Sequence, residues 1–261
     1  MGIDADGNLI DYHVGEKDLD AGVLRTVGDP KQRFSEDALR IIRAIRFASR
    51  FGMKIDKDTL EGINQIKGNL SKIAKERIGS ELIKTAEYGA KPFANVIKLI
   101  SETKINEVID PENVVDWSVA VKLTSRRVNK GTSEFDKNIK AAFGCMLYGA
   151  DLFKAAPLFR LENDLIKSLR WCYGSMQTYS DFGENLVETV KMVTNKDFDL
   201  LDELMNIIDG EGITEEELAN MKKLARLVQP HAKELSNAII DVGIKRTRLW
   251  QSVEDLVRMV L

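Results

Sequence analysis

The sequence predicts an all-α protein, an elongated series of helices with a short β segment at its N-terminus. Apolar residues recur at the spacing of amphipathic helices from residue 35 almost to the end of the chain. Only five of the 261 residues are prolines, and each stands at or near the end of an expected helix, where its missing amide hydrogen is tolerated. The chain holds no fixed-period repeat and no low-complexity tract.

The expected elements can be justified in chain order. Residues 1–33 are expected to form short strands and a turn, and Ser35 is expected to cap the first long helix, with Glu36 and Asp37 in its first turn. Thr214 begins a capping box that starts a late helix. The expected helices are 35–51, 57–66, 75–88, 91–101, 115–125, 135–153, 160–175, 182–194, 199–208, 214–227, 230–241 and 248–260.

The helix expected over 35–51 has two chemically distinct faces. Four arginines fall within an arc of roughly 120° when residues are plotted at helical intervals; they are Arg40, Arg43, Arg46 and Arg50. The opposite side is expected to hold Ile41, Ala44, Ile45, Ala48 and Phe51. We expect the apolar face to pack against a core and the arginine face to meet phosphate groups.

Asp37 and Arg40 stand three residues apart, so their side chains are expected to be neighbours on this helix. The carboxylate can accept from an exocyclic amine, and the guanidinium can donate to a ring nitrogen or a carbonyl. Cytosine and adenine present an amine beside an acceptor nitrogen, whereas guanine and uracil present the reverse order. The pair can therefore select C and A without a template strand. The alternative is an ordinary ion pair on a solvated helix face.

Residues 7–51 resemble one protein family. They contain Gly-Asn-Leu-Ile-Asp, Gly-Glu-Lys-Asp-Leu, Arg-Thr-Val-Gly-Asp-Pro and, from residue 33, Arg-Phe-Ser-Glu-Asp-Ala-Leu-Arg-Ile-Ile-Arg-Ala-Ile-Arg-Phe-Ala. These motifs, and Glu-Arg-Ile-Gly-Ser-Glu-Leu at 76–82, are similar to those of class II CCA-adding tRNA nucleotidyltransferases and the related bacterial poly(A) polymerases. Ala38 resembles the CCA-adding branch, because the poly(A) branch often has proline at that position.

The resemblance implies CCA addition to the 3′ end of tRNA, with CTP and ATP as substrates. It implies that Asp37 and Arg40 recognise the base, that Arg43 and Arg46 hold the nucleotide, and that Glu36 supports them. It also implies a division of the chain into a head remnant at 1–33, a nucleotide-reading neck at 34–88, a helical body at 89–160 and a tRNA-binding tail at 161–261.

Members of this family begin with an α/β catalytic head, most of which is missing from this sequence. The head holds a phosphate loop and an Asp-x-Asp pair for two metal ions, so Mg²⁺ is implied for the complete enzyme while its ligands are absent here. Asp4 and Asp6 form an Asp-x-Asp that we expect to be a plain turn. We therefore expect no catalytic residue and no metal ligand, and a chain that is inactive alone.

Other residues that often carry chemistry are expected to be structural. His13 and His231 stand alone and are expected at the surface or at helix ends. Cys145 and Cys172 lie in apolar helical stretches, which favours buried free thiols over a disulfide or a zinc site. The three tryptophans are expected in the core rather than as platforms for base stacking.

Composition and charge favour a soluble, cytoplasmic protein that binds nucleic acid. Two cysteines argue against a disulfide-stapled secreted fold, and no segment has the pattern of a signal peptide or a membrane span. The formal net charge is −3, but residues 31–50 hold six Lys or Arg against two acids. Basic clusters at 122–130 and 245–248 can also bind RNA or simply complement helix dipoles.

The sequence leaves two classes of function open. The first is the part of a CCA-adding enzyme that supplies base selection and tRNA binding, with the catalytic head on a separate subunit or otherwise outside this chain. The second is a helical tRNA- or protein-binding module derived from the same family, without turnover. A fragment of a poly(A) polymerase-type enzyme is a further alternative within the first class.

Overall fold

The computed structural model describes residues 2–3, 5–129, 138–178, 192 and 195–208. Internal contacts divide the chain into one unit of residues 1–163 and a second of residues 164–261. The expected helix 182–194, except for residue 192, and the expected helices beyond residue 209 lie outside the described residues, as do His231 and Trp250. All five residues predicted for the nucleotide site lie in the first unit.

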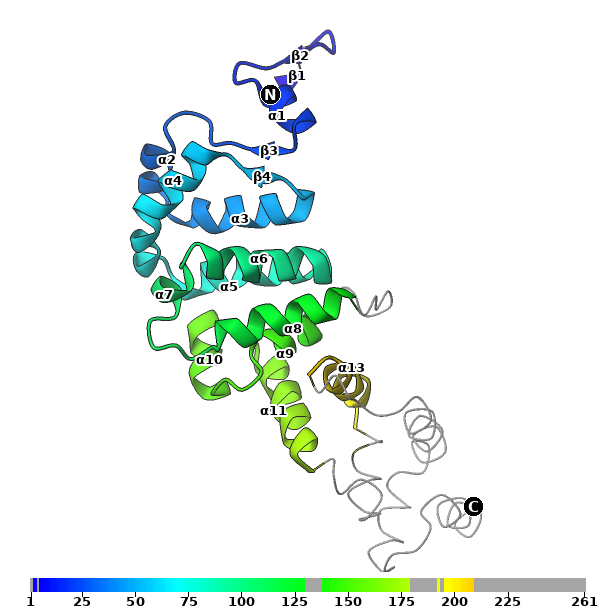
Figure 1. Ribbon diagram of the computed structural model, residues 1–261. Coiled ribbons are helices and arrows are strands. Elements are labelled where there is room, and N and C mark those ends of the chain that lie inside the picture. The colour runs from blue at the N-terminus through cyan, green and yellow to red at the C-terminus, as the bar shows by residue number, and fades with distance from the viewer. Residues whose placement is uncertain (1, 4, 130–137, 179–191, 193–194, 209–261) are drawn as a thin grey trace, which may run out of the picture. The chain divides into compact units, whose positions relative to one another are not determined.

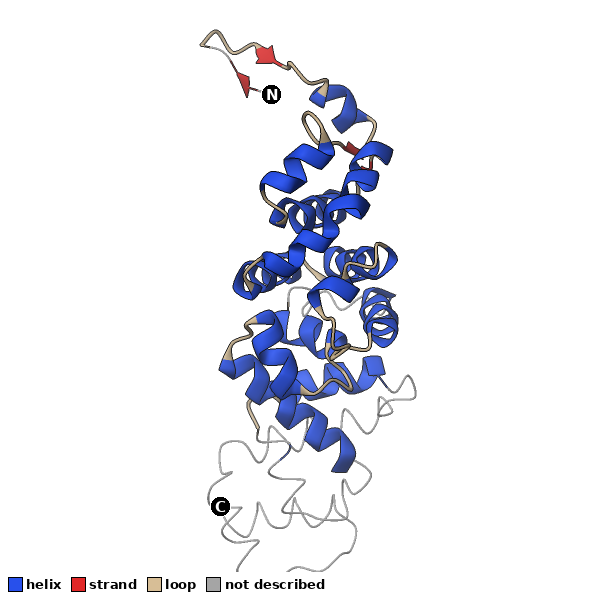
Figure 2. Cartoon of the chain, turned by 90° about the vertical axis from the view of Figure 1, so that its left-hand side faces the viewer, coloured by secondary structure: helices blue, strands red, loops and turns tan. Residues whose placement is uncertain are grey.

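The described residues form an all-α fold with a small β component, as predicted. Figure 2 shows strands only in the N-terminal part of the described chain. Strands β1 (Gly2–Ile3) and β2 (Leu9–Ile10) pair antiparallel around a turn that includes Asp6, as expected there. After α1 (Gly15–Asp20), strand β3 (Val23–Leu24) pairs in parallel with β4 (Lys54–Ile55), a strand that the sequence did not reveal.

The prediction of a single helix over 35–51 is wrong, because two helices occupy this stretch. Helix α2 (Pro30–Glu36) begins at the N-cap Asp29, whose carboxylate accepts from the Lys31 amide at 3.0 Å. Pro30 suits the first position of a helix, since its fixed φ is already helical and its missing N–H is not needed there. Asp37 adopts an extended conformation (φ −151°, ψ 104°) that ends α2, and α3 spans Leu39–Phe51. Ser35 is thus inside α2 and caps nothing.

The helices of the first unit stack in successive layers. Helix α3 packs on α5 and α6, α6 packs on α8, and α8 packs on α9, an order that can be followed in Figure 1. Helix α2 packs on α4, next to α3. The bounds of these further elements are α4 Lys57–Ile66, the 3₁₀ helix η1 Lys67–Lys72, α5 Lys75–Ala86, α6 Ala90–Glu102, α7 Asn106–Ile109, α8 Trp117–Asn129, α9 Ile139–Met146 and α10 Leu152–Phe159.

The helix expected over 135–153 is also wrong in its extent, because α9 ends at Met146 and a separate helix, α10, spans Leu152–Phe159. Between them Gly149 has a φ of +79°, which glycine adopts without steric cost, and Asp151 caps α10 by accepting from the Phe153 amide at 2.9 Å. Helix α10 approaches α5 very closely at Gly79. A Cβ at that position would clash with the carbonyl oxygen of Phe159. Only glycine permits this approach of the two helices.

The apolar face of α3 forms much of the core around the site. Ile41 and Ile45 are fully buried and Ala48 is nearly so, as the helical spacing predicted. Phe51, placed on the same face by that prediction, is 57% exposed instead. Trp117 is buried against Phe159, with ring centroids 6.5 Å apart, in agreement with a core role.

Two helices, α11 (Asn163–Thr178) and α13 (Phe198–Ile208), account for most of the described residues of the second unit. Lys196 forms an ion pair with Asp164 at 2.9 Å within this unit. Cys172 here, like Cys145 in the first unit, is a buried cysteine outside any disulfide, as predicted. Within the described ranges of both units, no helix is long and apolar enough to cross a membrane.

Candidate nucleotide-binding site

Asp37 lies at the junction of α2 and α3 and is held by two donors. Its Oδ1 accepts from the Leu39 backbone N–H at 3.0 Å, and its Oδ2 accepts from Nη2 of Arg77 at 2.9 Å. The Asp37 side chain is 31% exposed, so it remains accessible at the surface. The carboxylate is therefore fixed in orientation without being enclosed.

Arg40 makes a different set of contacts from the one expected. Its Nη1 donates to the carboxylate of Glu36, in the last turn of α2, and to the carbonyl oxygen of Arg33 at 2.9 Å. Glu36 also accepts from Arg33 at 2.8 Å. Asp37 and Arg40 therefore form no direct ion pair with each other. Each of the two predicted base-reading groups is instead held by its own partner, which for Arg40 is the predicted supporting residue Glu36.

The electrostatics of this junction keep both acids ionised. Burial opposes ionisation of Asp37, but the Leu39 N–H, the hydrogen bond and charge of Arg77, and the charge of Arg40 together hold the pKa of this carboxyl below its ordinary value of 3.8. The hydrogen bond from Arg40 is the main cause that lowers the pKa of Glu36. At neutral pH Asp37 can therefore accept hydrogen bonds but cannot donate them, as recognition of an amine requires.

Arg43 and Arg46 differ sharply in environment. Arg43 is exposed on α3, and its guanidinium has no partner among the described residues. Arg46 is only 6% exposed; its Nε donates to Glu81 at 2.7 Å, and its guanidinium lies 4.2 Å from the centroid of the Phe47 ring. The expectation that Arg46 shares an open phosphate-binding face with the other arginines is therefore wrong in its geometry. Glu81, on α5, neutralises the charge of Arg46. Both side chains are almost removed from water, so each charge needs the other as its counter-ion.

A line of polar contacts follows the interface between α3 and α5, which we call the α3–α5 seam. It consists of Asp37 with Arg77, Arg46 with Glu81, and Arg50 with Tyr88, where Nη1 of Arg50 donates to the hydroxyl at 2.8 Å. Arg50 also lies over the Tyr88 ring, 3.9 Å from its centroid. The sequence contained a signal for this seam, since Arg77 and Glu81 lie in the motif at 76–82, but no role was assigned to either residue.

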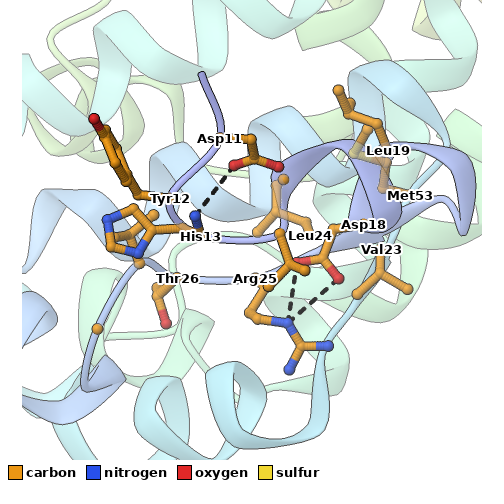
Figure 3. Close-up of a pocket in the computed structure, with 14 residues that line it drawn as sticks. Asp11, Tyr12, His13, Asp18, Leu19, Val23, Leu24, Arg25, Thr26 and Met53 are labelled. Atoms are coloured by element: carbon orange, nitrogen blue, oxygen red, sulfur yellow. Dashed lines mark hydrogen bonds and ion pairs between the residues drawn. The ribbon is translucent and has the colours of Figure 1, made fainter. Parts of the chain in front are cut away.

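A separate pocket of about 550 Å³ lies in the N-terminal segment. Figure 3 shows Arg25 turned toward Asp18 and the side chains of Tyr12 and His13 at its rim. Arg25 pairs with Asp18 at 3.0 Å and with Asp56 at 2.8 Å, so its charge is already engaged. None of the predicted nucleotide ligands lines this pocket. The predicted site is instead an open surface at the α2–α3 junction.

The described residues offer no metal centre. No three His, Cys, Asp or Glu side chains within the described ranges lie close enough together to hold a metal ion. Asp6 lies in the β1–β2 turn, and Asp4 falls outside the described residues. The residues that the structure describes therefore do not fit a Mg²⁺ site.

Comparison with known proteins agrees with this architecture. Residues 52–112 match the family described as "Probable RNA and SrmB- binding site of polymerase A". The chain is 40% identical over 174 residues to the CCA-adding enzyme of Bacillus subtilis (strain 168), a match that covers 64% of this chain and 41% of the relative. It is 32% identical over 183 residues to the CCA-adding enzyme of Geobacillus sp. (strain WCH70), covering 68% of this chain and 43% of the relative.

Solved structures share the fold. The Bacillus stearothermophilus CCA-adding enzyme in complex with CTP superposes with a TM-score of 0.65 at 20% identity, covering 99% of this chain and 65% of that one. The Thermotoga maritima CCA-adding enzyme complexed with tRNA gives a TM-score of 0.55 at 18% identity, covering 96% and 66%. At these identities the likeness shows a common fold.

The fold is thus one that this chain shares with the solved CCA-adding enzymes. These matches together support a relationship of this chain to the family of CCA-adding enzymes and poly(A) polymerases. It spans about two fifths of the length of the curated relatives described above, at 41% and 43%. This partial coverage fits a C-terminal portion of the family's architecture.

Proposed function

We propose that this chain supplies base selection and tRNA binding for the addition of CCA to tRNA 3′ ends, a nucleotidyl transfer from CTP and ATP. Relatives named as CCA-adding enzymes, and the solved complexes of such enzymes with CTP, ATP and tRNA, support the proposal. In this proposal residues 34–88 read the nucleotide and the later helices, including those at 161–261, bind tRNA.

The observation that carries the proposal is that Asp37 and Arg40 are each held from one side and open on another. Each Asp37 oxygen accepts one hydrogen bond within the protein and has a further lone pair. Arg40 uses only Nη1, and its Nε and Nη2 have no partner among the described residues. An amine and a neighbouring acceptor nitrogen, the edge that cytosine and adenine share, match this acceptor and donor.

The arginines beyond Arg40 have different roles in this proposal. Arg43, which is exposed and unpartnered among the described residues, contacts the phosphates or sugar of the nucleotide. Arg46 is buried on Glu81, so it positions α3 rather than touching the nucleotide. Catalysis itself, and the Mg²⁺ that the family resemblance implies, belong to a head domain. The comparisons lend no support to a head on a separate subunit, and the proposal does not depend on one.

The test is equilibrium binding of CTP, ATP, GTP and UTP to the full 261-residue chain. Asp37→Ala and Arg40→Ala should each reduce the preference for CTP and ATP over GTP and UTP by about 1–3 kcal/mol, or roughly 5- to 150-fold. Arg43→Ala should weaken all four nucleotides alike. Lys98→Ala, which removes an exposed pair with Glu102 on α6, is the matched control and should change nothing. Equal affinity of the unmodified chain for all four nucleotides would contradict the proposal.

The alternative function is a helical RNA-binding module without nucleotide selection. The match of residues 52–112 to an RNA-binding region favours it, because that match does not include Asp37 or Arg40. Binding of tRNA by a chain that distinguishes none of the four nucleotides would support this alternative. A preference for ATP alone would instead favour activity of the poly(A) polymerase type.

A further inference from the structure

We infer that Arg77 is a specificity-determining positioning residue, which fixes the Asp37 carboxylate in the orientation that reads the base amine. The inference rests on the proposed function, since it concerns how Asp37 discriminates. Nothing in the sequence pattern or in the comparisons assigns a role to Arg77. Its guanidinium lies 2.9 Å from Oδ2 of Asp37, across 40 residues of sequence.

Asp37 needs such a partner because no helix fixes it. The residue lies in an extended conformation between two helices, with α2 ending at Glu36 and α3 beginning at Leu39. An Asp side chain at such a junction can rotate about both of its torsions unless its oxygens are bound. Rotation would exchange or misplace the lone pairs that face the base. Discrimination between an amine and a carbonyl oxygen requires that the acceptor stay in place.

The two donors on Asp37 together define the carboxylate plane. The Leu39 N–H fixes Oδ1 at 3.0 Å, and Arg77 fixes Oδ2 at 2.9 Å. A single hydrogen bond would leave the carboxylate free to swing about that bond, whereas two donors on different oxygens do not. The Leu39 amide belongs to the backbone, so Arg77 is the one side chain among the described residues that completes this arrangement.

Arg77 is itself well anchored by its helix. It lies in the first turn of α5, which begins at Lys75. Gly79 holds this helix against the backbone of Phe159, and Glu81 ties it to Arg46 of α3. The position of Arg77 relative to Asp37 is therefore set by packing between helices. The side chains of Arg77 and Asp37 are 50% and 31% exposed, so a nucleotide can reach the carboxylate while the pair stays intact.

Stability alone does not explain this contact. A half-exposed ion pair adds little to folding, about 0–1 kcal/mol. The chain offers a direct comparison one residue away, because Glu76 pairs with Arg160 at 2.9 Å with both side chains more than half exposed. The two pairs are alike in length and both join α5 to another element. They differ in that one of them holds the proposed base-reading carboxylate.

The experiment measures affinities of CTP, ATP, GTP and UTP for the full chain carrying Arg77→Ala, Arg77→Lys or the control Arg160→Ala. We expect Arg77→Ala to lower the ratio of C and A affinity to G and U affinity at least fivefold. Arg77→Lys should give a ratio between those of the unmodified chain and Arg77→Ala, because an ammonium supplies the charge without the planar guanidinium. Arg160→Ala should leave the ratio unchanged. The double variant Asp37→Ala, Arg77→Ala should be no less selective than Asp37→Ala alone, since Arg77 acts through Asp37.

The outcomes separate this inference from the proposed function. If Asp37→Ala loses selectivity while Arg77→Ala behaves like Arg160→Ala, the role of Arg77 is overturned and base reading by Asp37 stands. If the double variant loses selectivity beyond Asp37→Ala, Arg77 touches the nucleotide itself and the positioning role is overturned. If the unmodified chain binds all four nucleotides equally, the proposed function fails and this inference fails with it. Far-ultraviolet circular dichroism of each variant checks that the helices are retained.

Discussion

Replacing Glu81 with glutamine should destabilise the first unit severely, because the substitution leaves the Arg46 charge buried without a counter-ion. The two side chains are each only 8% exposed, and Nε of Arg46 lies 2.7 Å from Oε2 of Glu81. Glutamine has nearly the same shape and can still accept a hydrogen bond, so the change removes charge rather than volume. Breaking a buried pair by removing one partner costs about 3–5 kcal/mol.

The measurement is urea denaturation of the full chain, followed by circular dichroism. With a slope of about 2 kcal/mol per molar urea, this cost lowers the unfolding midpoint by roughly 1.5–2.5 M. Glu76→Gln is the matched control on the same helix, because it removes the charge of an exposed pair with Arg160. An exposed pair is worth about 0–1 kcal/mol, so the control should shift the midpoint by no more than about 0.5 M.

A double variant sharpens the test. Replacing Arg46 with methionine and Glu81 with leucine removes both charges from the interior, so no uncompensated charge remains. The double variant should therefore be more stable than Glu81→Gln, as buried ion pairs replaced by apolar residues often are. Equal midpoint shifts for Glu81→Gln and Glu76→Gln would refute the reasoning, since burial would then have no bearing on the cost of losing the charge.

Two further predictions concern packing and pH. Gly79→Ala should cost about 1–3 kcal/mol or more in urea denaturation, because its Cβ would meet the Phe159 carbonyl, whereas Gly68→Ala, with open space around it, should be almost neutral. The contribution of Asp37 to stability should be constant between pH 7 and pH 5, because its folded pKa lies below the unfolded value, and it should be lost only as the pH falls below about 4. Subtracting the stability of Asp37→Asn from that of the unmodified chain at each pH measures it, and a loss already complete at pH 5 would contradict the sign of the shift.

The helical fold could be predicted from the sequence because its signals are local. Apolar spacing and boundary prolines identified most helices of the first unit, and the predicted 57–66 coincides with α4. The errors in the predicted helix and strand positions also have local causes. Asp29 is a good N-cap residue and Pro30 suits the first position of a helix. Together they indicate a helix that starts five residues before the predicted start at Ser35. The β3–β4 pair joins strands of two residues each, too short to leave a pattern.

The contacts around the proposed site could be predicted only in part. Motif spacing identified the residues at the α2–α3 junction but could not show what holds them, because their partners come from distant sequence. Arg77 meets Asp37 across 40 residues, and Glu81 meets Arg46 across 35. The expectation that Asp37 and Arg40 are neighbours on one helix face assumed one continuous helix. The break at Asp37 removes that assumption: Arg77 of α5 holds the Asp37 carboxylate, whereas Glu36 of α2 holds Arg40.

The geometry of α3 explains why its arginines have different environments. A spacing of three residues falls short of a helical turn by about 60°, so Arg40, Arg43 and Arg46 wind around the helix instead of forming one column. Arg46 reaches the edge of the arc that α5 covers, where Glu81 neutralises it. Phe51, eleven residues after Arg40, returns to within about 20° of it and so lies on the exposed face. Helical period alone places these residues on an arc, but the position of α5 decides which end of the arc is buried.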